Sequence, residues 1–214
     1  MGQERTYRGI GATERIAQRR RQLLDATLAI WGDVDRPKVT MTGVCQQAGL
    51  TERYFYESFA NLDEALVAVL EEIADEIEQR TIATLASAGG APADRAHASI
   101  AAFVQILTDD PRKGRAAIVE SASLDATRSH HALLLRRFAR MSAREARKLF
   151  GPDAWGEPEG AFAATMFVGG VAQLVASWID GTLPATPEAI IDAAARNFAA
   201  TAQASLQPQA PQVP

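Results

Sequence analysis

Helical periodicity limits what this chain can fold into more than any other feature. From Thr13 to about Leu206, apolar residues recur every three or four positions, the spacing that places them on one face of an α-helix. No run alternates apolar and polar residues as a half-buried strand does, and no internal repeat is visible. The sequence therefore predicts an all-α protein of about nine helices. Because 47% of the 214 residues are hydrophobic, one large domain or two small ones can bury a core.

Two short helices joined by a tight turn are predicted between Thr40 and Phe59. Thr40 is a good N-cap, because its hydroxyl can accept a hydrogen bond from a free backbone N–H of the first turn. Gly49 can adopt the positive φ that ends a helix, and Thr51 can cap the helix that follows. The pattern is that of a helix-turn-helix.

The second of these helices has two different sides. Phe55 and Phe59 are four residues apart and share one face, so they can anchor the helix on a core. Glu52, Arg53 and Tyr56 form a polar patch on the opposite side. A helix of this kind suits the major groove of DNA, although an ordinary amphipathic helix of an all-helical protein gives the same pattern.

Several residues stand at fixed spacings over more than forty positions, namely Leu23-Leu24-Asp25-Ala26-Thr27, Trp31, Thr40, Ala48-Gly49-Leu50-Thr51, Tyr56, Phe59 and Glu64-Ala65-Leu66. In these residues the run from Leu23 to Leu66 resembles the DNA-binding domain of the TetR family of bacterial transcription regulators. The resemblance implies a helix-turn-helix domain at 13–62 and a helical ligand-binding and dimerisation domain at 63–206. The lack of apolar periodicity predicts a flexible arm at 1–12, and the Pro- and Gln-rich composition predicts a disordered tail at 207–214.

Charge is unevenly distributed along the chain, whose net charge is −4. Residues 1–60 hold nine Lys or Arg against seven Asp or Glu, whereas the remainder holds thirteen against nineteen. We therefore expect a phosphate-facing surface in the N-terminal third. The arm at 1–12 contains Arg5 and Arg8 and is either a disordered terminus or a segment that reaches a minor groove.

Residues of the helix-turn-helix and of the preceding helix are the candidates for contact with double-stranded DNA. Arg53 stands where the family often has glycine; it either reads a guanine edge or contacts a phosphate. Leu62 lies close to where the family commonly places a phosphate-binding lysine, and the segment is one residue longer than usual. The expected DNA-contacting residues are Thr40, Thr42, Thr51, Glu52, Arg53, Tyr54, Tyr56, Arg19 and Arg20.

The stretch from Ala161 to Ile179 has nineteen residues and no charge, which is long enough to span a membrane. Its acidic flanks lack the Lys and Arg of a membrane anchor, so we expect a helix buried from both sides instead. The resemblance implies that the last two helices pair with those of a second subunit. The expected homodimer interface is Gly169, Gly170, Ala172, Ala176, Ile190, Ile191, Ala194 and Phe198.

The resemblance also implies a pocket for a small-molecule effector among the C-terminal helices. A few polar groups in an apolar cavity are what orient a ligand, although each apolar candidate could equally be plain core. Glu120 and His131 could instead lie partly exposed at helix edges. The expected lining residues are Phe103, Leu107, Glu120, Leu124, His131, Leu134, Phe138, Phe162 and Met166.

No catalytic constellation is visible, so we expect neither an enzyme nor a metal or other cofactor. The chain has no HExxH, CxxC or Gly-rich phosphate loop, and the neighbours His130 and His131 point about 100° apart on a helix. The single cysteine, Cys45, is either a core thiol or a redox sensor, and it agrees with a reducing cytoplasm. No signal peptide is visible, and the segment around Trp155 is expected to have little order.

Taken together, these patterns predict a dimeric, cytoplasmic transcription regulator. We expect a repressor that binds a palindromic operator and is released by a small, largely apolar molecule. The alternative is a helical protein that binds or sequesters a small molecule and whose helix-turn-helix no longer reads DNA.

Overall fold

The computed structural model describes residues 11–35, 38–156 and 159–204, and these residues form helices and connecting segments without a strand. The chain divides into two compact units, residues 1–69 and residues 70–214, so the division falls inside a helix rather than in a linker. The expected tail at 207–214, and all but the last two residues of the expected arm at 1–12, lie outside the described residues.

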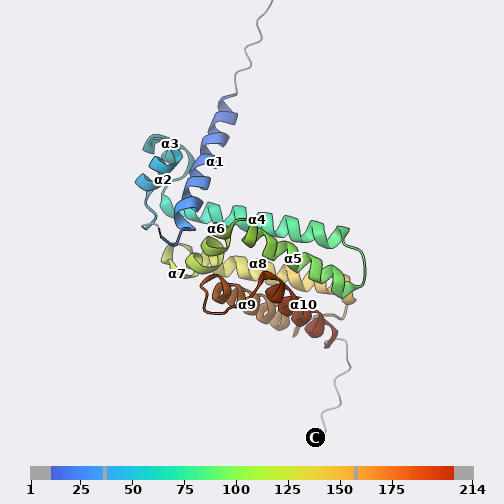
Figure 1. Ribbon diagram of the computed structural model, residues 1–214. Coiled ribbons are helices and arrows are strands. Elements are labelled where there is room, and N and C mark those ends of the chain that lie inside the picture. The colour runs from blue at the N-terminus through green and yellow to red at the C-terminus, as the bar shows by residue number, and fades with distance from the viewer. Residues whose placement is uncertain (1–10, 36–37, 157–158, 205–214) are drawn as a thin grey trace, which may run out of the picture. The chain divides into compact units, whose positions relative to one another are not determined.

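The first unit is built on three mutually packed helices, α1 (Ala12–Trp31), α2 (Met41–Ala48) and α3 (Glu52–Ser58), followed by the first turns of α4 (Leu62–Ser87) (Figure 1). Phe55 and Phe59 are fully buried, with ring centroids 5.6 Å apart. Leu23 of α1 and Val44 of α2 are also completely buried. The predicted aromatic face of α3 is therefore confirmed as the side that packs on the core.

Local hydrogen bonds define the turn between α2 and α3. Thr40 caps α2, because its Oγ1 accepts a hydrogen bond from the Gly43 N–H at 3.1 Å. Gly49 ends the helix with a φ of 65°, and the Leu50 N–H donates to the Cys45 carbonyl at 3.0 Å. Thr51 precedes α3, but its side chain makes no capping bond.

The second unit contains the rest of α4 and all later helices. They are α5 (Pro92–Asp109), α6 (Pro111–Gly114), the π-helical turn η1 (Arg115–Glu120), α7 (Ser121–Ser123), α8 (Asp125–Phe150), α9 (Glu159–Ile179) and α10 (Pro187–Ala204). Because α6, η1 and α7 follow one another without a break, the described residues contain nine helical segments, as predicted.

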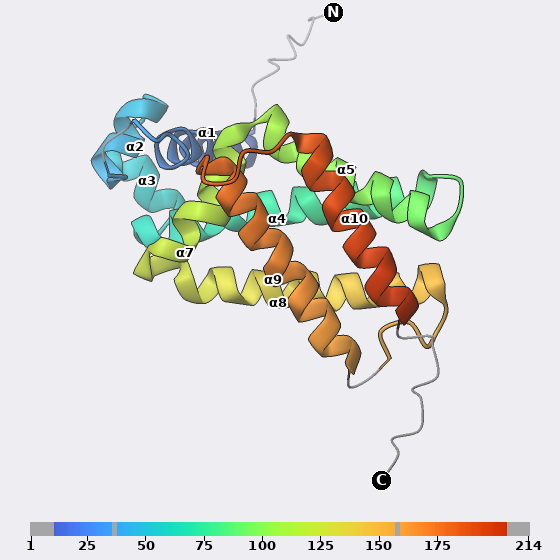
Figure 2. The same cartoon turned by 60° about the horizontal axis from the view of Figure 1, so that its bottom comes forward.

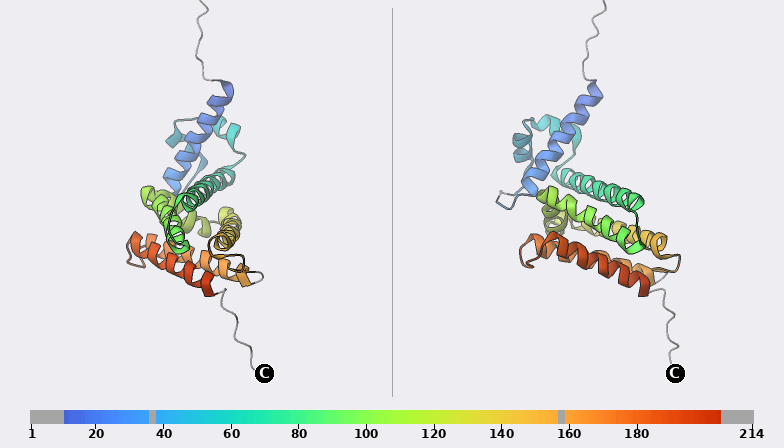
Figure 3. Two further views of the ribbon diagram at one scale, coloured as in Figure 1. Left: turned by 90° about the vertical axis from the view of Figure 1, so that its right-hand side faces the viewer. Right: turned by 45° about the vertical axis from the view of Figure 1, so that its right-hand side comes forward.

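Helices α9 and α10 lie side by side and cover the other helices of the second unit. Helix α9 packs mainly on α8, and α10 packs mainly on α5 (Figure 2). Two further views show the same arrangement within this unit (Figure 3). The side of α9 that faces away from α8 and the side of α10 that faces away from α5 are therefore the sides nearest the surface of this unit.

The expectation of little order around Trp155 is wrong. Trp155 is completely buried, with its ring 5.0 Å from that of Phe198 and 5.9 Å from that of Phe167. Gly160 makes this possible: a Cβ at that position would lie 1.8 Å from the Trp155 carbonyl oxygen. The turn-forming composition of residues 151–160 predicts a loop, but it does not show that one side chain of that loop returns to the core.

Helix α9 is, within the described ranges, the one helix long and apolar enough to cross a membrane by length and composition. The mean hydropathy of its most apolar window is 1.6, yet only 11% of that window is buried within the chain. The expectation of a helix buried from both sides is thus not met by a single copy of the chain.

Candidate functional site

The outer side of α3 presents an accessible polar surface. The Arg53 side chain is 84% exposed, and Tyr56 is 58% exposed with its ring edge against the buried Phe55. Glu52, at the start of the same helix, is also exposed, as is Thr51 before it. The Arg53 Nε lies 3.3 Å from Glu57 Oε1 on the helix surface, a contact that restrains the side chain only weakly. Arg53 and Tyr56 can therefore turn to contact a partner.

Arg19 and Arg20, which are expected to contact phosphates, both contact α3 or the residues at its C-terminal end. Arg19 lies 3.3 Å from Glu57 Oε2 and 4.3 Å above the Tyr54 ring, so Arg19 and Tyr54 contact each other. Arg20 donates to the Ser58 carbonyl at 3.4 Å and lies 4.4 Å above the Phe59 ring. Both guanidinium groups tie α1 to α3 and its C-terminal end, so they position the outer surface of α3 from within the protein.

Thr40 and Thr42 are exposed at the start of α2, where Thr40 serves as the N-cap described above. Thr42 Oγ1 lies 3.5 Å from Glu52 Oε1 and so connects the exposed sides of the two helices. Cys45 is buried, and desolvation, with a smaller effect of Glu52, raises the pKa of its thiol. This environment favours a core thiol over a redox sensor.

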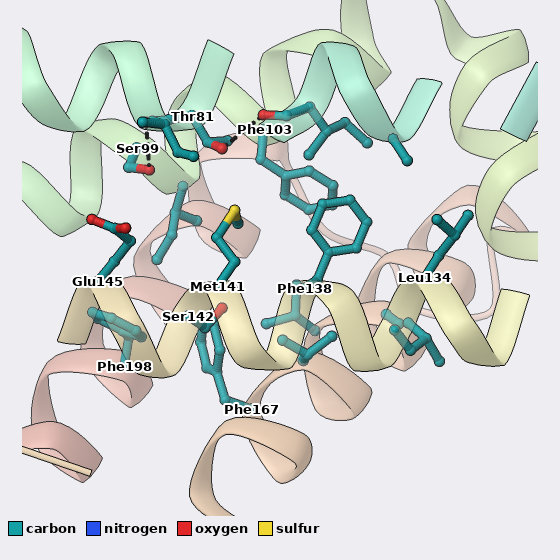
Figure 4. A pocket seen from close by; sticks show the side chains of 18 of the residues that line it. Thr81, Ser99, Phe103, Leu134, Phe138, Met141, Ser142, Glu145, Phe167 and Phe198 are labelled. Atoms are coloured by element: carbon teal, nitrogen blue, oxygen red, sulfur yellow. Dashed lines mark hydrogen bonds between the residues drawn. The ribbon is translucent and has the colours of Figure 1, made fainter. Parts of the chain in front are cut away.

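A cavity of about 160 Å³ lies inside the second unit, among α4, α5, η1, α8, α9 and α10. Its walls are almost wholly apolar. Of the expected lining residues, Phe103, Leu134 and Phe138 do line it (Figure 4). His131 is a fourth expected residue that lines it. A space of this size and polarity can hold an apolar group about as large as benzene without rearrangement.

Phe162 and Met166 do not line the cavity, which corrects the expectation for them. They are 67% and 76% exposed, whereas Phe167 of the same helix faces inward and lines the cavity. The cause is the turn of about 100° per residue in α9, which sends neighbouring apolar residues to different sides. Because α9 is apolar all round, its sequence does not show which of its apolar residues face the cavity.

Leu107, Glu120 and Leu124 are also absent from the cavity wall. Leu107 packs in a separate core cluster with Val104. Glu120 forms an ion pair with Arg115 at 2.9 Å, and Leu124 stands at the N-cap of α8. The sequence indicates the right region of the chain for these residues, but it does not show which way each side chain points.

Several polar and sulfur-bearing residues of the cavity were missed by the sequence reasoning. Met141, Ser142 and Glu145 continue the stripe that His131, Leu134 and Phe138 begin on α8, so helical spacing alone could have found them. Thr81 and Ser99 line the cavity from α4 and α5. No comparable signal in the sequence separates these two from other small polar residues.

His131 is neutral in this environment. Its Nδ1 lies 3.2 Å from the Ala117 carbonyl and 2.8 Å from Ser121 Oγ, whose own hydrogen is donated to that same carbonyl at 2.6 Å. A carbonyl can only accept, so in the tautomer that bonds to Ala117 the hydrogen is on Nδ1 and Nε2 keeps a lone pair. Burial lowers the pKa of His131, and the bond to Ala117 opposes this only in part.

The lowered pKa of His131 gives a prediction for stability. Below its ordinary value of 6.5 the unfolded chain protonates at His131 before the folded protein does, so acid lowers the free energy of unfolding. Replacing His131 by phenylalanine removes this component. We expect the variant to gain stability relative to the parent as the pH falls from about 7 to about 5, measured by urea titration. A constant difference across that range would contradict the neutral buried histidine.

The expected dimer-interface residues divide into two groups. Ile190, Ala194 and Phe198 are 2%, 3% and 5% exposed inside the second unit, so they cannot bury surface against another subunit, and the expectation for them is wrong. Gly169 and Gly170 are exposed, and a Cβ at either would meet no neighbour. The half-buried residues are Ala172, Ala176 and Ile191, and Ala172 also lines the cavity.

Ion pairs join α4 to α8 within the second unit. Arg137 of α8 contacts three carboxylates of α4, those of Glu71 at 3.2 Å, Asp75 at 2.6 Å and Glu78 at 2.6 Å. The hydrogen bond to Asp75 is the main cause that raises the pKa of Arg137. Long charged side chains therefore hold this edge of α4 in place.

Comparison with known proteins shows the fold. A scan against models of protein families and a search of curated proteins found no match. Among solved structures, the chain is similar to the fatty acid degradation regulator FadR from Bacillus halodurans, with 13% identity, a TM-score of 0.70 and coverage of 84% of this chain and 94% of that one. It is also similar to a TetR-like transcriptional regulator from Rhodococcus sp. RHA1, with 16% identity, a TM-score of 0.63 and coverage of 89% and 96%.

A third similar structure contains a ligand. It is the transcriptional regulator FadR from Bacillus subtilis in complex with stearoyl-CoA, with 14% identity, a TM-score of 0.69 and coverage of 83% of this chain and 96% of that one. The chain has the fold of TetR-like transcriptional regulators. This confirms the all-α class and the resemblance stated from residues 23–66.

Proposed function

We propose that the protein is a ligand-responsive, DNA-binding transcription regulator, acting in the cytoplasm as a homodimeric repressor of a palindromic operator. One observation carries this proposal: a helix-turn-helix whose second helix is anchored by Phe55 and Phe59 and turns Arg53 and Tyr56 outward, within the fold of TetR-like regulators. An exposed helix of this kind can enter a major groove.

The exposed face of α9 supports the dimer. Phe162, Met166, Gly169, Gly170 and Gln173 are all exposed and recur at helical spacing, so they form one continuous strip. An apolar strip next to two glycines lets a second helix approach closely. A second copy of the chain would cover it by two-fold symmetry. To bind a palindromic operator, the two recognition helices would need to lie near one DNA turn apart, about 34 to 36 Å, or at a somewhat altered spacing on deformed DNA.

The apolar cavity supports an effector, and α4 supplies a route for its influence. Leu70, Ile73, Ala74 and Ile77 of α4 line the cavity, while the first turns of the same helix belong to the DNA-binding unit. A ligand that binds more tightly when α4 is in one position than in another would favour the first position and so change operator affinity. The coupling free energy between two such sites is typically about 1 to 3 kcal/mol. The neighbour that holds stearoyl-CoA supports a largely apolar effector for this chain as well.

Replacing Arg53 by alanine is expected to weaken binding to the operator by about tenfold to a hundredfold, because a bidentate contact to guanine contributes about 1 to 3 kcal/mol. Binding to the intergenic DNA beside the gene, measured by fluorescence anisotropy at fixed salt with random DNA as competitor, gives this value. Arg136→Ala is the matched control, since it removes the same charge from an exposed position of α8.

The result also decides what Arg53 contacts. An equal loss on operator and random DNA, with a shallower salt dependence, would assign Arg53 to a phosphate. Binding of the parent protein no better to any neighbouring promoter than to random DNA would overturn the regulator and favour a protein that only binds or sequesters a small molecule.

A further inference from the structure

Five polar side chains of the described residues line the cavity, and two of them already use their hydroxyl hydrogens. Thr81 Oγ1 donates to the Ile77 carbonyl at 2.7 Å, and Ser99 Oγ donates to the Thr81 carbonyl at 3.1 Å. Both hydroxyls are therefore satisfied by the backbone. They do not require a ligand.

The other three residues each keep an unused polar atom. Within the part of the chain that the structure describes, the hydrogen bonds of His131 involve only Nδ1, those of Glu145 involve only Oε1, and Ser142 Oγ makes none. Glu145 Oε2 can only accept, as can His131 Nε2 in the tautomer whose Nδ1 donates to Ala117, whereas the Ser142 hydroxyl can donate or accept. The cavity thus presents mainly acceptors, so a ligand that satisfies them must bring hydrogen-bond donors.

Glu145 stands at the edge of the cavity in a defined position. It is 8% exposed, and its Oε1 is already occupied by Lys148 Nζ at 2.8 Å and Arg144 Nε at 3.2 Å. Its carboxylate extends from α8 on the same side as the side chain of Met141 (Figure 4). Ser142 lies one turn earlier on the same helix, so the two side chains are neighbours on the cavity wall.

The apolar wall of the cavity bears on the remainder of the ligand. It includes residues of α4 from Leu70 to Leu85 and of α8 from His131 to Leu149. At about 1.5 Å per residue these stretches are about 22 and 27 Å long. An extended apolar chain can therefore contact apolar side chains of both helices along the wall.

We propose that the effector is an elongated apolar molecule ending in a hydroxyl group, whose O–H donates to Glu145 Oε2 and whose oxygen accepts from Ser142 Oγ. The apolar part lies against the apolar wall towards Phe138 and Leu134. A terminal carboxylate is disfavoured, because its charge would face that of the Glu145 carboxylate, whose two cationic partners contact the other oxygen, Oε1. This assignment rests on the proposed effector role of the cavity and names the chemistry that the cavity selects.

Octanol, octanoate and octylamine share one chain and differ in the head group, so they test the assignment by calorimetry on the full-length protein without DNA. Octanol is expected to bind at least about tenfold more tightly than octanoate, the difference made by a hydrogen bond to a charged group. Octylamine should also bind more weakly than octanol. The Glu145 carboxylate is already paired with Lys148 and Arg144. The ammonium group of octylamine would therefore be buried without a carboxylate left to pair with it.

The Glu145→Gln variant tests the residue that makes this selection. Its amide offers a hydrogen-bond donor in place of the carboxylate, so the affinity for octanoate relative to that for octanol should rise by at least about tenfold. A change of preference between two ligands is not produced by a mere loss of stability. The comparison therefore separates a contact with the head group from a structural role of Glu145.

Glu78→Gln is the matched control, because Glu78 is also paired with Arg144 but does not line the cavity, and it should leave the order of the three compounds unchanged. Octylamine or octanoate binding more tightly than octanol, an unchanged preference in Glu145→Gln, or no binding of any of the three would each overturn the assignment. Since no DNA is present, the outcome is separate from the regulator proposal. Operator binding could fail while octanol binds as expected, and the reverse combination is equally distinguishable.

Discussion

Replacing Trp155 by alanine is expected to lower the free energy of unfolding by about 3 to 5 kcal/mol, the usual cost of removing a fully buried large aromatic side chain. Trp155 packs on Phe167 and Phe198, which also line the cavity, so the change would open a void beside it. Such a loss is a large share of the stability of a typical domain, about 5 to 15 kcal/mol. Urea unfolding followed by circular dichroism measures it.

Trp155→Phe provides the control for this experiment. The indole Nε1–H is buried and has no hydrogen-bond partner among the described residues, so the phenylalanine variant loses volume but no hydrogen bond. We expect it to cost less than half as much as the alanine variant. A loss below about 1 kcal/mol for Trp155→Ala, close to the range of ordinary surface changes, would show that the segment is not part of the core.

A glutamate in place of Met166 is expected to separate the proposed dimer into monomers while leaving the helical content unchanged. Because the interface has two-fold symmetry, the new carboxylate of each subunit would be buried without a charged partner. An uncompensated buried charge costs about 3 to 5 kcal/mol, so the dissociation constant of the dimer should rise by at least about a thousandfold. Sedimentation equilibrium gives the mass. Operator affinity should fall with it, since two half-sites are no longer bound together.

Leu133→Glu is the matched control, because it places the same charge at a half-exposed apolar position of α8 that lies outside the α9 strip. This variant should remain a dimer. If the Met166→Glu variant remains a dimer, the interface does not lie on α9. If the parent protein is monomeric at micromolar concentration, the proposed homodimer is wrong.

Local signals in the sequence were sufficient for the helix-turn-helix. Thr40 and Gly49 mark the ends of α2 by chemistry that acts within a few residues, and the spacing of Phe55 and Phe59 identifies the buried face of α3. For the cavity, the apolar stripe on α8 identified three lining residues for the same reason, namely His131, Leu134 and Phe138. These features depend on one helix at a time.

Features that depend on two helices were harder to predict. Helix α9 is apolar on every side, so nothing in its periodicity shows that Phe167 faces inward and Met166 outward. On α10, Ile190 and Phe198 form a clear apolar stripe, but the sequence does not show whether such a stripe meets its own chain or a second copy. The burial of Trp155 depends on the close approach of its carbonyl group to the backbone of Gly160, which the sequence does not show.

The middle of α4 carries like charges at a spacing that weakens an isolated helix. Glu71 and Asp75 are four residues apart, and so are Glu72 and Glu76. The opposing charges come from other helices, because Arg137 of α8 contacts Glu71 and Asp75, and Lys113 of α6 contacts Glu76. We therefore expect this part of α4 to gain its full stability only when α6 and α8 dock against it, so that it unfolds together with them as one cooperative segment.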